Sequence, residues 1–324
     1  AIAQDLNKSV GGITAAMQLR TDIQKLSDTS ISNASLSKLD ECIQDWLSVV
    51  FCVDSLSLEH ITFDSSGTTL ERIARSDTVH AVRSISSLKK RLHNGRRCYA
   101  LVHHALPNYP LAFIHVALTS QLANSMSSLD SLNDRVSPSH AMFYSVNSTS
   151  PAFRGLSLAP HLIKEVVRDL QLTCPGIRVF STLSPIPNFM KWLNKLKPTG
   201  VLLEKHWNNI HTAVAALHPN TTGHIKNDDI WQVLMNGLNN QPLEWSSNND
   251  VQALLQEPLM WLAARYITTT RVSKSGQWGT IEPVGNFHMG NGAEFHRLNW
   301  MGNPSLAGLR SSAGMMVNYL YDLP

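Results

Sequence analysis

The stretch from His140 to Leu183 constrains the fold most, because its pattern predicts a strand, a loop, a helix and a second strand in that order. Residues 140–148 and 177–183 are apolar, strand-like runs. The helix between them, residues 160–172, has proline in its first turn, repeats apolar side chains on one face and ends at Cys174-Pro175-Gly176. Such a unit places adjacent parallel strands with the loop at their carboxyl ends, where ligands bind.

The loop of this unit, Arg154 to Pro160, leads directly into the helix. Backbone N–H groups at a helix start lack intrahelical acceptors, and with the helix dipole they favour an anion such as pyrophosphate. An ordinary helix entry with an exposed arginine looks the same, and by itself that alternative is favoured. The position of the loop between two strands favours phosphate binding, because acyltransferases of the GNAT type carry a phosphate-binding loop there with the consensus R/Q-x-x-G-x-G/A. Arg154 and Ala159 fit it, whereas Ser157 replaces the central glycine.

Ser184 follows the second strand and precedes Pro185-Ile186-Pro187. Pro185 lacks a backbone donor and favours an extended Ser184, so the serine hydroxyl is held in a defined direction. The alternative, slightly favoured from spacing alone, is a serine that ends the strand and caps a helix beginning near Asn188. A hydrolase nucleophile is disfavoured, because no G-x-S-x-G elbow surrounds Ser184.

His288 lies between Asn286-Phe287 and Gly290-Asn291-Gly292. Because Asn-Gly is typical of a tight turn, we expect His288 at the end of a strand beside a loop. Most of the 14 histidines are expected in the core or at the surface. The polar and glycine neighbours of His288 favour a functional role, and Asn286 and Asn291 are candidates for orienting it on adjacency alone.

The charge pattern argues against several classes of function. Only 16% of the residues are charged and the formal net charge is +3, with the basic residues scattered apart from a run at 89–97, so we expect no nucleic-acid partner. A small positive excess suits a polyanionic small substrate. No run of about eighteen apolar residues exists, so no membrane-spanning helix and no membrane partner are expected. The first residues lack the features of a signal peptide, and a start without Met suggests a processed or trimmed form.

Metal binding is not expected. The four cysteines are Cys42, Cys52, Cys98 and Cys174. Their wide spacing, without a C-x-x-C pair, argues against zinc and for reduced thiols in an intracellular compartment. His224, Asp228 and Asp229 could imitate a metal cluster, but they lie in a polar loop, and we reject a metal there.

The chain as a whole predicts an α+β fold in one large domain or two unequal ones. Residues 1 to about 50 form two amphipathic segments at helical spacing, and residues 189–267 are mostly helical. Residues 56–119 alternate strands with short helices, and residues 121–137 read as a polar surface loop with a short helix. Residues 275–321 return to glycine-punctuated strands and turns.

Four stretches resemble the malonyl-CoA decarboxylases, in the same order. They are FYSVNSTSPAFRGLSLAPHLIKEVVRDL, VFSTLSPIPNFMKWL, EPLMWLAARY and NFHMGNGAEFHRLNWMGNPSLAGLRSSAGMMVNYLY. Weaker agreement extends back to LEHITF, so the resemblance covers nearly everything from about residue 46 onward. The S-P-I-P and F-H-x-x-N-G-A stretches are specific to that family.

The resemblance implies two domains. Residues 1–45 would be a partial N-terminal helical bundle, the C-terminal part of an oligomerisation domain, and residues 46–324 a GNAT-like catalytic domain with a mixed sheet flanked by helices. It implies a homo-oligomer, a dimer or tetramer, formed through the helical domain. A cytoplasmic location is expected, or a mitochondrial or peroxisomal one in a eukaryote, because no targeting signal is visible.

The resemblance also implies conversion of malonyl-CoA to acetyl-CoA and CO₂, with Ser184 and His288 as the catalytic pair. Loss of CO₂ leaves charge on a thioester enolate, so the substrate is its own electron sink and no cofactor is needed. Ser184 would orient the malonyl carboxylate, and His288, if protonated, would protonate the carbanion carbon. The implied substrate-binding residues are Arg154, Gly155, Leu156, Ser157, Leu158, Ala159, Pro160, Ser184, Asn286, His288 and Asn291.

Two alternatives stay open. A GNAT-type acyltransferase that passes an acyl group from CoA to an amine shares the phosphate loop, so only Ser184 and His288 discriminate against it. A non-catalytic CoA-binding module would need neither side chain. The sequence also leaves open whether methylmalonyl-CoA is accepted and whether Cys98 takes part in a contact between subunits.

Overall fold

The computed structural model describes residues 11–28, 34–77, 82, 84–93, 95–130, 137–219, 226–272, 276 and 278–322. The chain divides into two compact units. Unit 1 comprises Ala1–Ser120 and Asn133–Arg178, and unit 2 comprises Gln121–Leu132 and Val179–Pro324. This division does not coincide with the boundary expected at residues 45/46, which stays a prediction.

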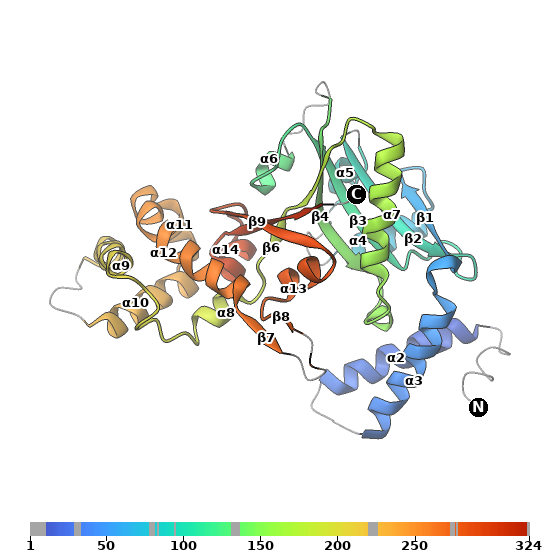
Figure 1. The fold of residues 1–324 in the computed structure, drawn as a ribbon, viewed down its shortest axis with the longest axis horizontal. Coiled ribbons are helices and arrows are strands. Elements are labelled where there is room, and N and C mark those ends of the chain that lie inside the picture. The colour runs from blue at the N-terminus through green and yellow to red at the C-terminus, as the bar shows by residue number, and fades with distance from the viewer. Residues whose placement is uncertain are drawn as a thin grey trace. The chain divides into compact units, whose positions relative to one another are not determined.

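Unit 1 is built on four strands, each antiparallel to the next (Figure 1). They are β1 (Leu56–Ile61), β2 (Arg96–His103), β3 (Ala112–Thr119) and β4 (His140–Ser148). Every side chain of β3 is buried, as its near-continuous apolar sequence predicts for a strand covered on both faces. Ile61, Cys98 and Phe113 meet in the core between the sheet and helix α4 (Gly67–Ser76).

Unit 1 contains further helices besides α4. They are α2 (Gly12–Asp28), α3 (Ala34–Val50), α5 (Ile85–Arg91), α7 (Leu158–Thr173) and the short 3₁₀ turns η1 (Val53–Ser55) and η2 (Pro151–Phe153). Helix α7 buries the apolar stripe seen in the sequence and contacts β2, β3 and β4, along one face of the sheet (Figure 1). Its stripe is Leu158, Leu162, Ile163, Val166, Val167 and Leu170.

Unit 2 is organised around β10 (Met316–Tyr321), which pairs antiparallel with three strands. These are β5 (Val179–Thr182), β6 (Ser184–Pro185) and β9 (Ala293–Asn299). A separate ribbon joins β7 (Thr270–Val272) to β8 (Trp278–Thr280). The buried Asn318 side chain donates to the carbonyls of Thr182 and Ala123, at 2.7 and 3.0 Å. These bonds hold the middle of β10 against its neighbours.

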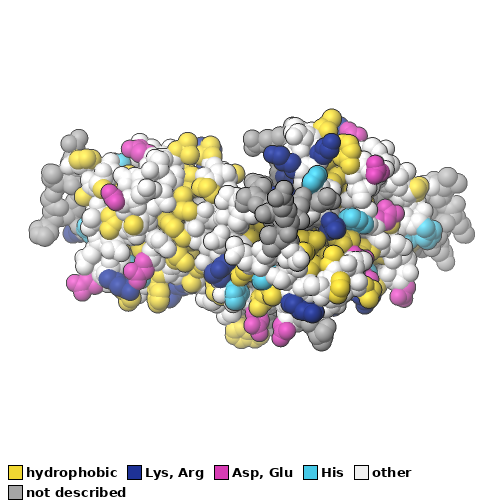
Figure 2. Space-filling view, turned by 90° about the horizontal axis from the view of Figure 1, so that it is seen from above, with side chains coloured by type: hydrophobic (Ala, Val, Ile, Leu, Met, Phe, Trp, Pro, Cys, Tyr) yellow, Lys and Arg dark blue, Asp and Glu magenta, His cyan; other side chains and the backbone are white. Residues whose placement is uncertain are grey.

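The rest of the described part of unit 2 is mainly helical. Its helices are α6 (Met126–Asp130), α8 (Phe189–Leu193), α9 (Glu204–Leu217), α10 (Asn227–Asn240), α11 (Pro242–Ser247), α12 (Asn249–Thr268), α13 (Pro283–Gly290) and α14 (Leu306–Ser312). Helix α9 packs against both α10 and α12 (Figure 1). On the face drawn in Figure 2, the described Lys and Arg side chains lie dispersed among neutral ones.

The predicted fold class is confirmed: helices at the N-terminus are followed by a mixed sheet flanked by helices. The prediction of only strands and turns over residues 275–321 is wrong, because α13 and α14 lie there. Capping residues and burial stabilise these short helices although glycines lower their helix propensity. Of the expected polar loop at 121–137, residues 131–136 lie outside the described part. Within the described residues, no helix is both long and apolar enough to cross a bilayer.

Candidate active site

Ser184 and His288, 104 positions apart, meet inside unit 2. Ser184 lies in β6, where its backbone pairs with Val317 of β10 and Pro185 follows it. Its Oγ is 3.3 Å from Nε2 of His288. Helix α8 begins at Phe189 with Asn188 at the N-cap position, so Ser184 does not cap it. The alternative role as a helix cap is therefore wrong.

His288 lies in the last turn of helix α13, not at the end of a strand, which corrects the expectation from the Asn-Gly pair. The turn at Asn291 and Gly292 exists, and Gly292 has a φ of +84°, but it ends the helix before β9. Glycine in a left-handed conformation just after a helix is a common C-terminal signal. Pro283 at the first helical position and Glu282 at the N-cap begin the helix.

Aromatic side chains surround the His288 ring, although its sequence neighbours are polar. The ring stacks on Tyr319, with centroids 5.0 Å apart and an interplanar angle of 27°. Its Nδ1 is 2.8 Å from Oη of Tyr321, and the Phe287 ring lies edge-on at 5.0 Å. Tyr319 and Tyr321 are two residues apart on β10, so both side chains leave the same face of the strand.

Burial determines the protonation state of the His288 ring. His288 is 5% exposed, and desolvation lowers its pKa to about 3, so the ring is neutral at neutral pH. Burial raises the pKa of the Tyr321 hydroxyl far above neutrality, so Tyr321 keeps its proton. When the neutral ring accepts a hydrogen bond from this hydroxyl at Nδ1, its own proton is on Nε2 and faces Ser184. A charged His288 therefore requires a bound group that opposes the effect of burial.

Sequence reasoning missed Tyr319 and Tyr321, which contact the His288 ring, and Glu282, which caps the helix that carries it. Glu282 is fully buried, and its pKa is raised by desolvation to about 6. The only available signal for the two tyrosines was the alternation of MVNYLY, which is typical of a buried strand. Nothing in that pattern indicates which buried tyrosine meets a histidine.

Asn286 and Asn291 lie on helix α13 with His288, but their side chains are engaged elsewhere. The Asn286 amide packs so closely on Gly279 that a Cβ there would lie 2.1 Å from its Oδ1. Nδ2 of Asn291 donates to the Phe287 carbonyl at 2.5 Å. Among the described residues, neither amide hydrogen-bonds to the His288 ring, and contact with a substrate stays a prediction for both.

The predicted phosphate loop lies in unit 1, between η2 and helix α7. Gly155 and Ser157 both take left-handed conformations, with φ of +81° and +53°. Ser157 thus adopts a backbone shape that glycine takes most readily, at the position where the consensus has glycine. Leu158 and Ala159 open α7, so their N–H groups have no intrahelical acceptor. Arg154 is exposed, whereas Leu156 is buried.

The structure brings together only Ser184 and His288 among the predicted site residues. The loop from Arg154 to Pro160 belongs to the other unit. Of the rejected metal cluster, Asp228 accepts a hydrogen bond from Thr199 at 2.7 Å, and His224 lies outside the described residues. In the described part of the chain, no three His, Cys, Asp or Glu side chains group as metal ligands would. Cys98 is fully buried in unit 1.

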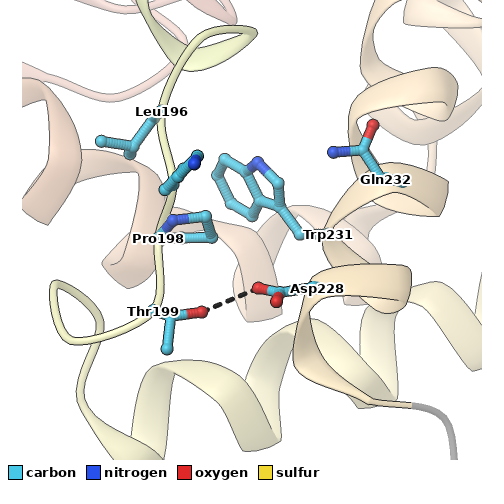
Figure 3. A pocket seen from close by; sticks show the side chains of 7 residues that line it. Leu196, Pro198, Thr199, Asp228, Trp231 and Gln232 are labelled. Carbon is cyan, nitrogen blue, oxygen red and sulfur yellow. Dashed lines mark hydrogen bonds between the residues drawn. The ribbon is translucent and has the colours of Figure 1, made fainter.

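Unit 2 also contains a pocket of 490 Å³ between α10 and the segment before α9 (Figure 3). Trp231 and Pro198 form its apolar walls, and the bond from Thr199 to Asp228 closes one side. None of its lining residues belongs to the group around His288. The pocket is separate from the candidate catalytic pair.

Comparison with known proteins agrees with this geometry. The family model described as "Malonyl-CoA decarboxylase C-terminal domain" matches residues 54–324. The chain is 36% identical to the mitochondrial malonyl-CoA decarboxylase of Anser anser anser over 330 residues, covering 100% of the chain and 64% of that protein. It is 33% identical to the Rattus norvegicus protein of the same name, covering 98% of the chain and 64% of the relative.

Solved structures of bacterial malonyl-CoA decarboxylases are similar too. The Agrobacterium vitis structure has a TM-score of 0.79 at 29% identity, covering 99% of this chain and 72% of that one. The Rhodopseudomonas palustris structure has a TM-score of 0.78 at 29% identity, with the same coverage. The chain spans 64% of the length of the curated relatives it matches, so it corresponds to a part of them.

Proposed function

Because the chain belongs to the malonyl-CoA decarboxylase family, we propose that it converts malonyl-CoA to acetyl-CoA and CO₂. The observation that carries the proposal is the buried contact between Ser184 Oγ and His288 Nε2. Two side chains from distant parts of the chain, both able to move or hold a proton, face each other in a desolvated setting. Such a setting strengthens hydrogen bonds to developing charge.

Ser184 positions the substrate in this proposal. Its hydroxyl donates to the malonyl carboxylate and holds it so that the breaking C–C bond lies perpendicular to the thioester plane. The electron pair of that bond then passes into the thioester to form an enolate, and CO₂ leaves. The thioester itself accepts the electrons, so the reaction as proposed needs no resident cofactor or metal.

His288 and Tyr321 supply the proton. The enolate carbon takes the proton from Nε2 of His288, while the Tyr321 hydroxyl, 2.8 Å from Nδ1, passes its proton to the other side of the ring. The ring thus stays neutral, as its lowered pKa favours. A proton from solvent then reaches Nε2 while Nδ1 gives its proton back to the Tyr321 oxygen, which restores the original tautomer.

The loop from Arg154 to Pro160 binds the CoA phosphates in this proposal. Support comes from the left-handed Gly155 and Ser157, which shape the backbone, and from the start of helix α7, where N–H groups and the helix dipole favour anions. The exposed Arg154 adds a positive charge at the same place. Asn286 and Asn291 remain proposed substrate contacts without a bond to His288.

The test is incubation with malonyl-CoA alone, followed by measurement of CO₂ and acetyl-CoA. Ser184→Ala is expected to lower kcat by about a hundredfold and His288→Asn by 10²- to 10⁴-fold, as is usual for lost orientation and proton transfer. CoA binding, measured by calorimetry, should be mostly kept in both. His296→Asn, an exposed histidine on β9, is the matched control and should keep full turnover.

The same assay decides between the alternatives. An acyltransferase would consume malonyl-CoA only when an amine acceptor is added, and a non-catalytic CoA-binding module would not consume it at all. Full turnover in His288→Asn would exclude the proton-donor role. Unchanged turnover in Ser184→Ala would leave Ser184 a structural part of β6.

Assembly and location are further parts of the proposal. The homo-oligomer expected from the family would form through the N-terminal helices, and sedimentation of the purified chain tests this. The Anser anser anser and Rattus norvegicus relatives are called mitochondrial, whereas a cytoplasmic location was expected for this chain. Fractionation of the source cells distinguishes the two.

A further inference from the structure

Glu282 is a buried carboxylate close to the catalytic pair, and the proposed reaction does not use it. It is fully buried and occupies the N-cap of helix α13, the eight-residue helix that carries His288. Its Oε1 accepts the N–H of Val284 at 3.1 Å, and its Oε2 accepts the N–H of Gly285. Glutamate is not among the preferred N-cap residues, yet here its carboxylate accepts two N–H groups of the helix.

The backbone of Glu282 is itself fixed. Oγ1 of Thr280 accepts the Glu282 N–H at 3.0 Å and donates to the Glu282 carbonyl at 2.9 Å. Thr280 ends strand β8, so both the main chain and the side chain of Glu282 are held before the helix begins. The start of α13 is therefore set by Glu282, whose carboxylate satisfies two of its free N–H groups.

The helix meets β10 through Tyr319. A Cβ added at Gly285 would lie 2.8 Å from Oη of Tyr319 and 3.1 Å from Oε2 of Glu282, so only glycine allows this close approach. Gly285 and His288 are three residues apart and share one face of the helix. Tyr319 thus spans one turn of α13, with its hydroxyl at Gly285 and its ring stacked on His288.

The carboxylate of Glu282 also faces Tyr319 directly, since Oη of Tyr319 donates to Oε2 at 3.5 Å. That bond is long, so the two backbone N–H bonds are the stronger restraint. Together these contacts join three groups: the start of helix α13, the Tyr319 side chain and, one turn further along the helix, His288.

We propose that Glu282 is a positioning residue for His288, which holds helix α13 and Tyr319 so that Nε2 of His288 faces Oγ of Ser184. This role rests on the proposed decarboxylase function. Glu282 acts through α13 and Tyr319 and does not touch the reacting atoms. A displacement of about 1 Å at a catalytic group can lower turnover by as much as a hundredfold.

Three variants separate the contacts. Glu282→Ala removes both bonds, Glu282→Gln keeps the size but presents only one acceptor to the helix, and Glu282→Asp is a good N-cap that is too short to reach Tyr319. We expect kcat to fall by about ten- to hundredfold in the alanine variant and less in the other two, with KM for malonyl-CoA within twofold. Glu294→Ala, an exposed glutamate on β9, is the control.

A second measurement does not depend on turnover. With ¹⁵N-labelled histidine, the ring nitrogens of His288 are identified by their loss in His288→Gln, and circular dichroism confirms folding of each variant. Glu282→Ala and Glu282→Gln should shift the His288 ring resonances, whereas Glu294→Ala should not.

The two measurements separate failures of different proposals. Unchanged His288 resonances and unchanged kcat in folded Glu282→Ala would overturn the positioning role. If the unaltered protein releases no CO₂, the decarboxylase function is wrong, and the resonances alone decide the role of Glu282. If KM rises by the same factor by which kcat falls in Glu282→Ala, the variant is damaged in general, and this result would also overturn the positioning role.

Discussion

Arg20, in helix α2, donates a hydrogen bond from Nη1 to the carbonyl of Ala152, 132 residues further along the chain, at 2.6 Å. Its side chain is 2% exposed, and the guanidinium pairs with Asp40 at 3.1 Å and donates to Oε1 of Gln44 at 2.5 Å. The Gln44 amide in turn lies against Gly155, where an added Cβ would be 2.9 Å from Nε2. The two N-terminal helices therefore hold the loop proposed to bind the CoA phosphates.

Gln44→Ala should weaken binding of malonyl-CoA, because the loop at Gly155 loses the side chain packed against it and must be ordered on binding. We expect KM for malonyl-CoA to rise about two- to tenfold, the effect of ordering one further side chain on binding, with kcat unchanged. KM for malonyl-pantetheine, which lacks the nucleotide phosphates, should stay the same. Steady-state kinetics with both thioesters measures this difference.

The control is Gln18→Ala, since Gln18 is exposed on α2 and bonds only to Asp22 in the described part of the chain. Equal changes with both substrates would mean that Gln44 supports unit 1 in general and not the phosphate loop. That result would exclude a specific effect of the N-terminal helices on CoA binding.

Tyr321→Phe should lower kcat by about ten- to hundredfold with KM kept, because Nδ1 of His288 loses a partner in a buried site. The ring then has no source for the second proton of the proposed relay. Tyr266→Phe is the matched control, since its hydroxyl donates to the Pro187 carbonyl at 3.4 Å and not to the histidine. Unchanged kcat in Tyr321→Phe would exclude the relay.

Gly285→Ala should reduce both stability and turnover, since the new Cβ would lie 2.8 Å from Oη of Tyr319. Overpacking of this kind costs about 1–3 kcal/mol. A Cβ at Gly290 in the same helix meets no atom of the described residues within 4 Å, and Gly290→Ala should stabilise the protein by up to about 1 kcal/mol. Thermal unfolding of the two variants should therefore shift Tm in opposite directions, and a shared direction would contradict the close contact.

Acid should destabilise the protein partly through His288. The pKa of His288 is lowered from 6.5 to about 3 on folding. As the pH falls below 6.5, the unfolded chain therefore protonates this residue before the folded chain does, and the free energy of unfolding decreases until the pH approaches 3. Between pH 7 and pH 5 the loss from this residue is about 2 kcal/mol.

His288→Gln removes that titration. Urea unfolding at pH 7 and pH 5 should show a smaller loss of stability in the variant, by about 2 kcal/mol. Other histidines titrate in both proteins and cancel in the comparison. An equal loss in both would mean that the His288 ring is accessible to solvent.

Part of this structure could be predicted because local pattern is enough to specify it. The apolar stripe of α7 repeats every three to four residues, and a helix with such a stripe has one face to bury. The strand β4, the loop after it and helix α7 were therefore predicted correctly. Ser184 and His288 were found as candidates from their unusual neighbours. Helix α13 was missed, because its stability comes from Glu282 and Tyr319 and not from the helix propensity of its glycines.

The sequence by itself determined the elements with strong periodicity, the family and the two side chains able to carry the chemistry. Only the tertiary structure decided how they work together. The pairing of β6 with β10 and the packing of α13 on Tyr319 bring Ser184 to 3.3 Å from His288 and add Tyr321 behind it. Such contacts depend on residues more than 30 positions apart, and burial of the whole group sets the pKa of His288. Neither effect leaves a trace in local spacing.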